Sequence, residues 1–213
     1  LASGSSGNCF YIGNGKGGVL VDAGISAKQI CEKMNFVGKS PQSIKAIFIT
    51  HEHSDHVRGA DVFARRFQIP IFITKKTAEE CFVCSEEVLV RVIRNNTKVN
   101  LCGMRIEAFS KSHDAADPVF YSVQEKKKIS VMTDLGYGCE NVKKQISESD
   151  FLILESNHDE YMLDSGPYPY FLKELIKSDI GHLSNKKAGL CVLEHSSKKL
   201  KNILLAHLSL VNN

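Results

Sequence analysis

A short segment of the sequence, ITHEHSDH at residues 49–56, concentrates side chains that bind metal ions. His51, His53, Asp55 and His56 fall within six residues, directly behind the apolar run IKAIFIT. Imidazole and carboxylate groups are ligands for Zn²⁺ first, with Mn²⁺ or Fe²⁺ as alternatives. A tight turn can direct the first two side chains to one point and the last two to a second point beside it. The spacing therefore predicts two neighbouring divalent ions rather than one.

Two such ions would give the site a specific chemistry. At a separation of about 3.5–4 Å they can activate a shared water and clamp both the attacking and the leaving oxygen of a phosphodiester. The nucleophile is then hydroxide and not a side chain. The segment predicts metal-dependent hydrolysis but does not by itself identify the substrate.

Short apolar, β-branched runs along the chain predict the strands that must position these ligands. They lie at 9–12, 18–24, 44–50, 70–74, 104–109, 119–123, 128–134, 150–156 and 202–208. Helical patterns lie between several of them, at 26–36, 57–67, 75–84, 168–178 and 184–197. Ser26 and Ser184 are the expected N-caps of two of these helices. Interleaved strands and helices indicate a layered α/β architecture.

Further candidate ligands lie at the carboxyl ends of predicted strands. Together with the first residue of the segment above, they are His51, His113, Asp134, Glu155 and His207. In open α/β sheets ligands bind at this edge, because the loops that leave the strands converge there. Residues far apart in the sequence are therefore expected to meet at one site. A lone histidine such as His195, in the helical stretch LCVLEHSSKK, is expected to be an ordinary surface or helix residue.

Length and composition favour one globular domain over residues 1–213, with 43% apolar and 24% charged residues. No apolar stretch approaches the roughly 20 residues that a membrane span requires. The seven cysteines are odd in number and scattered, which favours a reducing, cytoplasmic setting. Cys81 and Cys84 form a C-x-x-C without a second pair, and they are expected to belong to the helix at 75–84. The net charge of +3 permits an anionic partner without requiring one.

These residues resemble a known family. The segments VDAG, THEHSDH, SH at 112–113, TDLG at 133–136 and AHLS at 206–209 are similar to those of the metallo-β-lactamase fold. That fold is an αββα sandwich, with two mixed β-sheets flanked by helices and a dinuclear metal site on one edge. SGSSGN, LESNHD, GHLSN and the final LAHLSLVNN bring the resemblance closer still to the bacterial YycJ/WalJ group of 5′-to-3′ exonucleases. The resemblance covers almost the whole chain, but the family usually continues further, so the domain is expected to lack its C-terminal end.

The resemblance implies a ligand for every position of a dinuclear site. His51, His53 and His113 would hold one ion, Asp55, His56 and His207 the other, and Asp134 would bridge them. Asp22 would support a ligand or a bound water from outside the coordination sphere. An alternative for Asp22 is that it only forms a turn.

The resemblance also points to a proton donor. In the tRNA-maturing nucleases of this fold, a glutamate and a histidine from two separate motifs act near the leaving group. LILES and GHLSN look similar to those motifs, so Glu155 is expected to orient His182 as general acid. Asp55, Asp134, Glu155 and His182 are thus the expected catalytic residues. The alternative is that His182 only forms a hydrogen bond near the helix entry at Ser184.

Nucleic acid is the expected partner, DNA more than RNA, while the oligomeric state is not predicted. Only 73 positions separate Asp134 from His207, which is too few for the inserted domain of the β-CASP nucleases. Glycine-rich turns expose backbone amides to anions, so the loop from Ser3 to Asn8 could bind a terminal phosphate or could be a simple turn. The candidate substrate contacts are Ser3, Ser5, Ser6, Asn8, His158 and Asn185.

Two other functions remain open at this stage. A small-molecule hydrolase acting on a lactone, thioester or cyclic phosphodiester would use the same ions but would not need Glu155 and His182. A non-catalytic metal-binding protein would be favoured if a bridging ligand were missing, but none is. Clusters of lysines such as those at 75–76 and 186–187 could line a phosphate backbone or coat an ordinary solvated surface.

Overall fold

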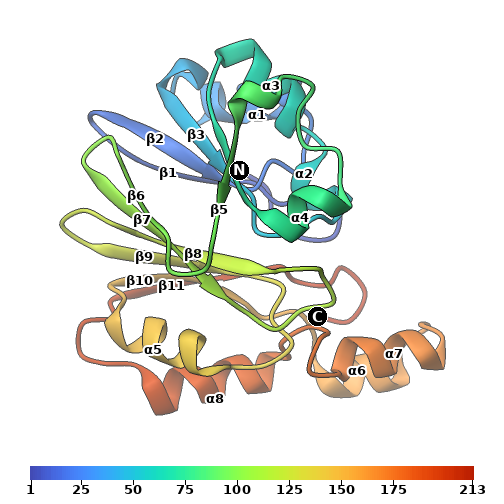
Figure 1. Cartoon of the computed structure of the whole chain (residues 1–213). Helices are drawn as coiled ribbons and strands as arrows, with labels where there is room; N and C mark the ends of the chain where they lie inside the picture. The colour runs from blue at the N-terminus through green and yellow to red at the C-terminus, as the bar shows by residue number, and fades with distance from the viewer. The chain divides into compact units, whose positions relative to one another are not determined.

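Two mixed β-sheets and their helices make up the fold of the chain, whose computed structural model describes residues 1–213 (Figure 1). The chain divides into two compact units. The first comprises Leu1–Ala108 and Ala115–Tyr121, and the second comprises Phe109–Asp114 and Ser122–Asn213. Each candidate ligand belongs to one of these units.

The first unit contains a five-stranded sheet in the order β1-β2-β3-β4-β5. β1 and β2 pair antiparallel, and the remaining neighbours pair parallel. The strands are β1 (Phe10–Asn14), β2 (Gly17–Val21), β3 (Ile44–Phe48), β4 (Ile71–Thr74) and β5 (Val90–Ile93). The helices are α1 (Ala27–Phe36), α2 (Ser54–Val57), α3 (Ala60–Phe67) and α4 (Lys75–Glu80), with 3₁₀ turns at Pro41–Ser43 and Glu87–Leu89.

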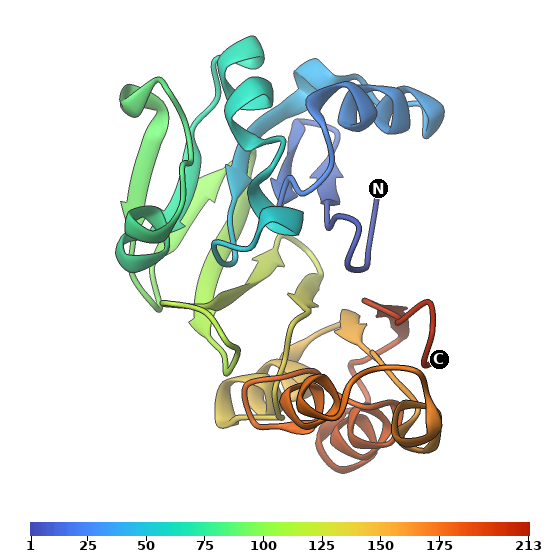
Figure 2. The ribbon, with the colours of Figure 1, turned by 90° about the vertical axis from the view of Figure 1, so that its right-hand side faces the viewer.

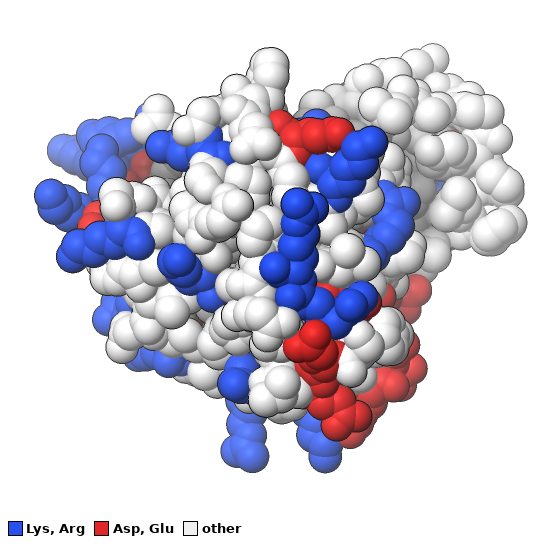
Figure 3. Space-filling view, turned by 90° about the horizontal axis from the view of Figure 1, so that it is seen from above, with Lys and Arg blue, Asp and Glu red and all other residues white.

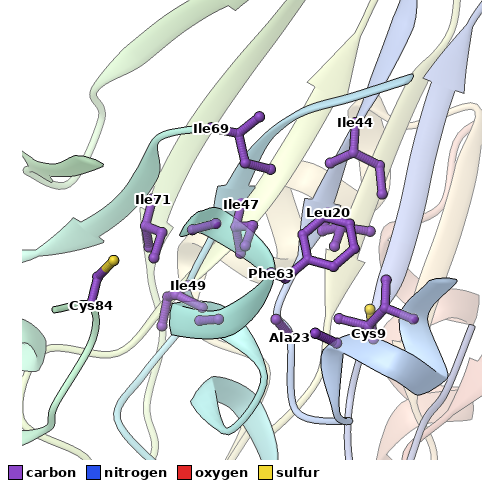
Figure 4. Packing of buried hydrophobic residues seen from close by; sticks show 14 of the residues in the cluster. Cys9, Leu20, Ala23, Ile44, Ile47, Ile49, Phe63, Ile69, Ile71 and Cys84 are labelled. Carbon is purple, nitrogen blue, oxygen red and sulfur yellow. The ribbon is translucent and has the colours of Figure 1, made fainter. Parts of the chain in front are cut away.

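A hydrophobic core holds α1 and α3 on this sheet. In α3 the apolar residues Ala60, Phe63, Ala64 and Phe67 recur at helical spacing, so they form one stripe. Phe63 is fully buried and lies among strand residues such as Leu20 and Ile47 (Figure 4). This packing fixes the end of β3, from which the ITHEHSDH segment departs.

The second sheet has six strands in the order β11-β10-β9-β8-β7-β6, and the division between the units passes through β7 and β8. β6 and β7 form an antiparallel pair, whereas β9, β10 and β11 pair parallel. The strands are β6 (Lys98–Leu101), β7 (Met104–Ser110), β8 (Val119–Gln124), β9 (Lys128–Met132), β10 (Phe151–Glu155) and β11 (Asn202–Ala206). The parallel arrangement brings the carboxyl ends of β9, β10 and β11 to one edge.

The remaining helices belong to the second unit. They are α5 (Glu140–Glu148), α6 (Glu160–Ser165), α7 (Tyr170–Lys177) and α8 (Asn185–His195). α5 and α8 pack against each other and against β9 and β10 (Figures 1 and 2). None of the helices in the chain combines the length and the apolar character needed to cross a membrane.

The predicted fold class is confirmed, because two mixed sheets with helices are present. All nine predicted strands form, within a few residues of the expected bounds, and Ser26 and Ser184 cap α1 and α8. β5, β6, α5 and α6 were not predicted. α5 buries only Val142, Gln145 and Ile146, so its apolar stripe is too thin to stand out from the sequence.

Two helix predictions were wrong in extent. α4 ends at Glu80, so Cys81 and Cys84 lie outside the helix in which they were expected. The helix predicted at 57–67 begins only at Ala60 as α3, and Asp55 and His56 lie in the separate short helix α2. The break follows from Gly59, where a Cβ atom would lie 2.0 Å from the carbonyl oxygen of Ile25. The chain must approach that loop closely, which interrupts the helix.

Candidate metal centre

The first unit carries four of the predicted ligands, His51, His53, Asp55 and His56, which we call the first ligand cluster. They follow β3 directly, in the turn that leads into α2. His51 and His56 are fully buried. Each ring nitrogen of a buried imidazole needs a hydrogen-bond partner or a bound ion. The partner of one nitrogen therefore decides whether the other can bind a metal ion.

Asp22 and Thr50 fix the orientation of both buried rings. His56 Nδ1 donates to Asp22 Oδ2 at 2.8 Å. His51 Nδ1 lies 2.9 Å from Thr50 Oγ1, which donates in turn to Asp22 Oδ2 at 2.9 Å. Because both Nδ1 atoms are then protonated, the Nε2 atoms carry the lone pairs. A carboxylate behind the ring is the usual support of a metal-binding histidine.

The lone pairs of the first cluster converge in two places. His51 Nε2 lies 3.0 Å from His53 Nδ1, and His56 Nε2 lies 3.4 Å from Asp55 Oδ2. Electron-rich atoms at such separations repel one another unless a proton or a cation lies between them. The two pairs match the predicted division of this segment between two ions.

The second unit carries the other candidates, His113, Asp134, Glu155, His182 and His207, which we call the second ligand cluster. Four of them follow or end strands β7, β9, β10 and β11, and His182 follows α7. The ligand atoms of Asp134, Glu155, His182 and His207 all lie within 4.8 Å of one another. Parallel pairing of β9, β10 and β11 explains why residues so distant in sequence meet.

Glu155 is the centre of this cluster. Its Oε1 accepts hydrogen bonds from His182 Nδ1 at 2.8 Å and from His207 Nδ1 at 2.9 Å. Its Oε2 accepts from the backbone N–H groups of Leu135 and Leu183. Burial opposes ionisation of this carboxyl, but the charge and the hydrogen bonds of the two histidines outweigh it and hold its pKa well below the usual range. Glu155 is therefore an anion that orients two imidazoles at once.

Asp134 faces two imidazole lone pairs. His207 Nε2 lies 3.4 Å and His113 Nε2 lies 4.0 Å from Asp134 Oδ1. The Nδ1 atoms of these rings point instead to Glu155 and to the carbonyl oxygen of Gly181. Burial and the nearby Lys111 charge lower the pKa of His113 to about 3, so this ring is neutral at pH 7. Imidazole Nε2 atoms around a buried carboxylate form a donor set that suits a divalent cation.

A left-handed backbone conformation occurs at one residue that supports the first ligand cluster and at two members of the second. The φ angles are 60° at Asp22, 56° at Asp134 and 56° at His207. For residues other than glycine this region is disfavoured, by roughly 1–2 kcal/mol for a residue without a compensating local hydrogen bond. Such strain is concentrated at functional sites, because the surrounding structure holds the residue in place.

The sequence matches a family of known proteins over most of its length. Residues 2–195 match the family model described as the metallo-beta-lactamase superfamily. The chain belongs to the metallo-β-lactamase superfamily. It is a metal-dependent hydrolase of this superfamily, as the buried histidine and carboxylate clusters indicate.

Several members of the superfamily show how far the likeness extends. The whole chain aligns at 38% identity with 82% of "Exodeoxyribonuclease YycJ" of Bacillus anthracis. It aligns at 37% identity with 81% of "Exodeoxyribonuclease WalJ" of Streptococcus pneumoniae. The solved structure of YhfI from Bacillus subtilis, a metallo-β-lactamase fold protein, superposes on all of the chain and 83% of its own with a TM-score of 0.71 at 14% identity. The fold and the kinship with the YycJ/WalJ group are thus as predicted.

The candidate substrate contacts lie in two places. Ser3, Ser5 and Ser6 are exposed on the N-terminal loop. His158 and Asn185 adjoin each other in the second unit, where Asn185 N donates to His158 O at 2.9 Å. His158 is buried, and this burial lowers its pKa.

Asn8 was predicted to contact substrate, but its side chain is fully buried. Its amide nitrogen lies 3.1 Å from both Asp55 Oδ2 and His56 Nε2. Its backbone N–H donates to the carbonyl oxygen of Asp55 at 2.7 Å. Asn8 therefore fixes the positions of Asp55 and His56 relative to each other.

Thr50 is a supporting residue that the sequence did not reveal. It occupies the position before His51, at the end of a strand, where a threonine carries no signal beyond β propensity. Only its contacts with Asp22 and His51 distinguish it.

We expect Thr50→Val to weaken metal binding about 10-fold or more, because the His51 ring loses the partner that fixes its tautomer. Competition with a chromophoric chelator measures the affinity. Thr77→Val is the matched control, since Thr77 is equally buried and its hydroxyl bonds to Thr74, away from the ligands. Equal metal affinities of the two variants would contradict the role of Thr50.

Proposed function

We propose that the protein is a metal-dependent 5′-to-3′ exonuclease that hydrolyses phosphodiester bonds of DNA. The observation that carries this proposal is the contact between Glu155 and His182, because hydrolysis of a phosphodiester requires a proton for the leaving oxygen. The two relatives with 37–38% identity are both named exodeoxyribonucleases, which supports the same reaction and DNA as the substrate.

The proposal assigns the ligands as the family pattern does. His51, His53 and His113 would hold one ion, Asp55, His56 and His207 would hold the other, and Asp134 would serve both. Zn²⁺ suits these nitrogen and oxygen donors best, with Mn²⁺ or Fe²⁺ as alternatives. When bound, the ions supply Lewis-acid chemistry that makes water nucleophilic near neutral pH and neutralises phosphodiester charge.

The protein's own residues prepare the proton donor. With Nδ1 held by Glu155, His182 can carry its second proton on Nε2, and the carboxylate stabilises that imidazolium form. The side chain of His182 is 24% exposed, so it can regain a proton from solvent after each turnover. Glu155 remains ionised throughout, because four hydrogen-bond donors surround it.

Surface charge plays a smaller part in this proposal. Figure 3 shows Lys and Arg side chains in several separate groups over the face displayed, with Asp and Glu at its lower right and in smaller groups elsewhere. That face carries no continuous basic path of the kind that tracks a long nucleic acid backbone. The proposal of a nuclease therefore rests on the site and the relatives rather than on the +3 net charge.

The test is degradation of 5′-labelled single- and double-stranded DNA and RNA by the purified protein in Zn²⁺ and then in Mn²⁺. We expect release of labelled mononucleotides from DNA. If no nucleic acid is degraded while a lactone or thioester is hydrolysed, the protein is a small-molecule hydrolase and the nuclease proposal is wrong.

Substitution of His182 separates these two functions further. We expect His182→Ala to lower DNA turnover by about 10²–10⁴-fold, the usual contribution of a general acid, while metal content is unchanged. Metal analysis and cleavage rates of the same sample provide both values. His195→Ala is the control, because His195 lies in α8 and contacts Glu194 outside both ligand clusters. Full turnover by His182→Ala would exclude the proposed acid.

A further inference from the structure

A polar cavity of about 500 Å³ lies in the second unit. It is lined by the end of β7 with the loop after it, and by the loop between β9 and α5 with the first turn of α5. The residues that matter for its chemistry are Ser110, Lys111, Ser112, Tyr137, Glu140 and Asn141. Its volume falls in the range of small-molecule sites and suits one nucleotide rather than a duplex.

The two loops that line the cavity are the loops that carry His113 and Asp134. Ser110 to Ser112 directly precede His113, and Tyr137 follows Asp134 by three residues. Three residues of chain span at most roughly 11 Å, so the tyrosine backbone lies within that distance of the Asp134 backbone. A ligand in the cavity is therefore close to residues of the second ligand cluster.

Hydrogen bonds connect the walls of the cavity rigidly. Lys111 Nζ donates to the carbonyl oxygen of Thr133 at 2.8 Å, next to Asp134. The backbone N–H of Gly136 donates to the carbonyl oxygen of Ser112 at 2.9 Å. Asn141 Nδ2 donates to the carbonyl oxygen of Ser110 at 3.0 Å. A group bound between these walls is held at a fixed position relative to the ligands.

The lining combines an aromatic face, a cation and hydrogen-bonding groups. Tyr137 is 44% exposed, so its ring is accessible. Lys111 is a buried ammonium, and the charge of Glu140 is balanced by Lys143 at 2.8 Å. The three ionic groups Lys111, Lys143 and Glu140 thus leave one net positive charge near the cavity. Bases stack on accessible aromatic rings, and phosphates are attracted by cations.

We propose that this cavity binds the terminal deoxynucleotide of the substrate, with its base stacked on Tyr137 and its phosphate attracted by Lys111. The proposal rests on the exonuclease function and names the part of the DNA that the protein grips. The product of each cleavage, a deoxynucleoside 5′-monophosphate, is then a ligand of the same cavity.

The experiment is a titration of the metal-loaded protein with deoxyadenosine 5′-monophosphate, followed by NMR or calorimetry. We expect Tyr137→Ala to weaken binding about 5- to 100-fold, the range that stacking of one base gives. In DNA cleavage the same variant is expected to raise KM with little change in kcat. Tyr137→Phe keeps the ring and should retain affinity. Tyr161→Ala is the control, since Tyr161 lies on α6 and is exposed outside the cavity.

The outcomes separate this proposal from the proposed function. If the protein cleaves DNA but Tyr137→Ala binds the monophosphate as wild type does, the cavity is not the nucleotide site. The same conclusion follows if Tyr161→Ala weakens binding equally. If the wild type cleaves no DNA yet binds the monophosphate through Tyr137, the cavity is a nucleotide site, but the nuclease proposal fails and with it the assignment of the cavity to the end of a DNA substrate.

Discussion

Glu155→Gln is expected to lower DNA cleavage by on the order of 10³-fold or more, because it removes the proton donor's partner. It is also expected to reduce metal content, since the same carboxylate orients His207. A glutamine side chain has only one carbonyl oxygen, so its NH₂ group must face hydrogen-bond donors of the protein. Either the two imidazole Nδ1–H groups or the backbone N–H groups of Leu135 and Leu183 would meet an NH₂ group. Each such buried mismatch costs about 1–3 kcal/mol.

Metal content per chain and the cleavage rate of one sample test this expectation. Circular dichroism and thermal unfolding of the same sample show whether the fold persists. Glu160→Gln is the matched control, because Glu160 accepts one hydrogen bond from Ser184 and contacts neither histidine of the pair. A Glu155→Gln variant that retains its metal and cleaves DNA within 10-fold of wild type would refute the central role of this carboxylate.

Gly24→Ala is expected to destabilise the protein by about 3 kcal/mol or more and to disrupt metal binding. A Cβ atom at this position would lie 1.5 Å from the carbonyl oxygen of Asp55 and 2.7 Å from the backbone nitrogen of Asn8. Both obstacles are backbone atoms, so no rotamer change can relieve the overlap. The N-terminal loop or the ITHEHSDH segment must move, and with it Asp55 and His56.

Urea unfolding and metal analysis of the variant measure the two effects. Gly15→Ala is the matched control, because no atom lies within 4 Å of its Cβ position in the β1–β2 turn. Its free energy of unfolding should stay within about 0.5 kcal/mol of wild type. A Gly24→Ala variant with wild-type stability and metal content would show that this close approach is not required.

Much of the fold could be predicted from the sequence because most of its strands are short apolar runs that do not also show the apolar spacing of a helix. β3, β9 and β10 consist mostly of buried residues in succession, which is how parallel strands appear in a sequence, and β11 is an apolar run. Since chemistry at α/β sheets lies at the carboxyl ends of strands, His51, Asp134, Glu155 and His207 could be located by position alone. The density of ligands in ITHEHSDH then made the donor set recognisable.

The supports of these ligands could not be predicted in the same way. Thr50 and Asn8 act through contacts between segments that are far apart in sequence or that meet only at a turn. Glu155 was expected beside His182, but its second contact with His207 depends on the parallel register of β10 and β11. β5 and β6 were missed because, of their sequences VRVI and KVNL, only Ile93 is buried. Strands with so little burial carry a weak hydrophobic signal.

The left-handed backbone at Asp22, Asp134 and His207 implies a conflict between stability and chemistry. Glycine would adopt those angles at no steric cost, and asparagine would adopt them more readily than histidine. Random variants selected only for resistance to heat should therefore accumulate glycine or asparagine at these positions. Such variants would lose the supporting carboxylate or the ligands. The aspartates and the histidine at these positions therefore favour activity at the expense of thermal tolerance.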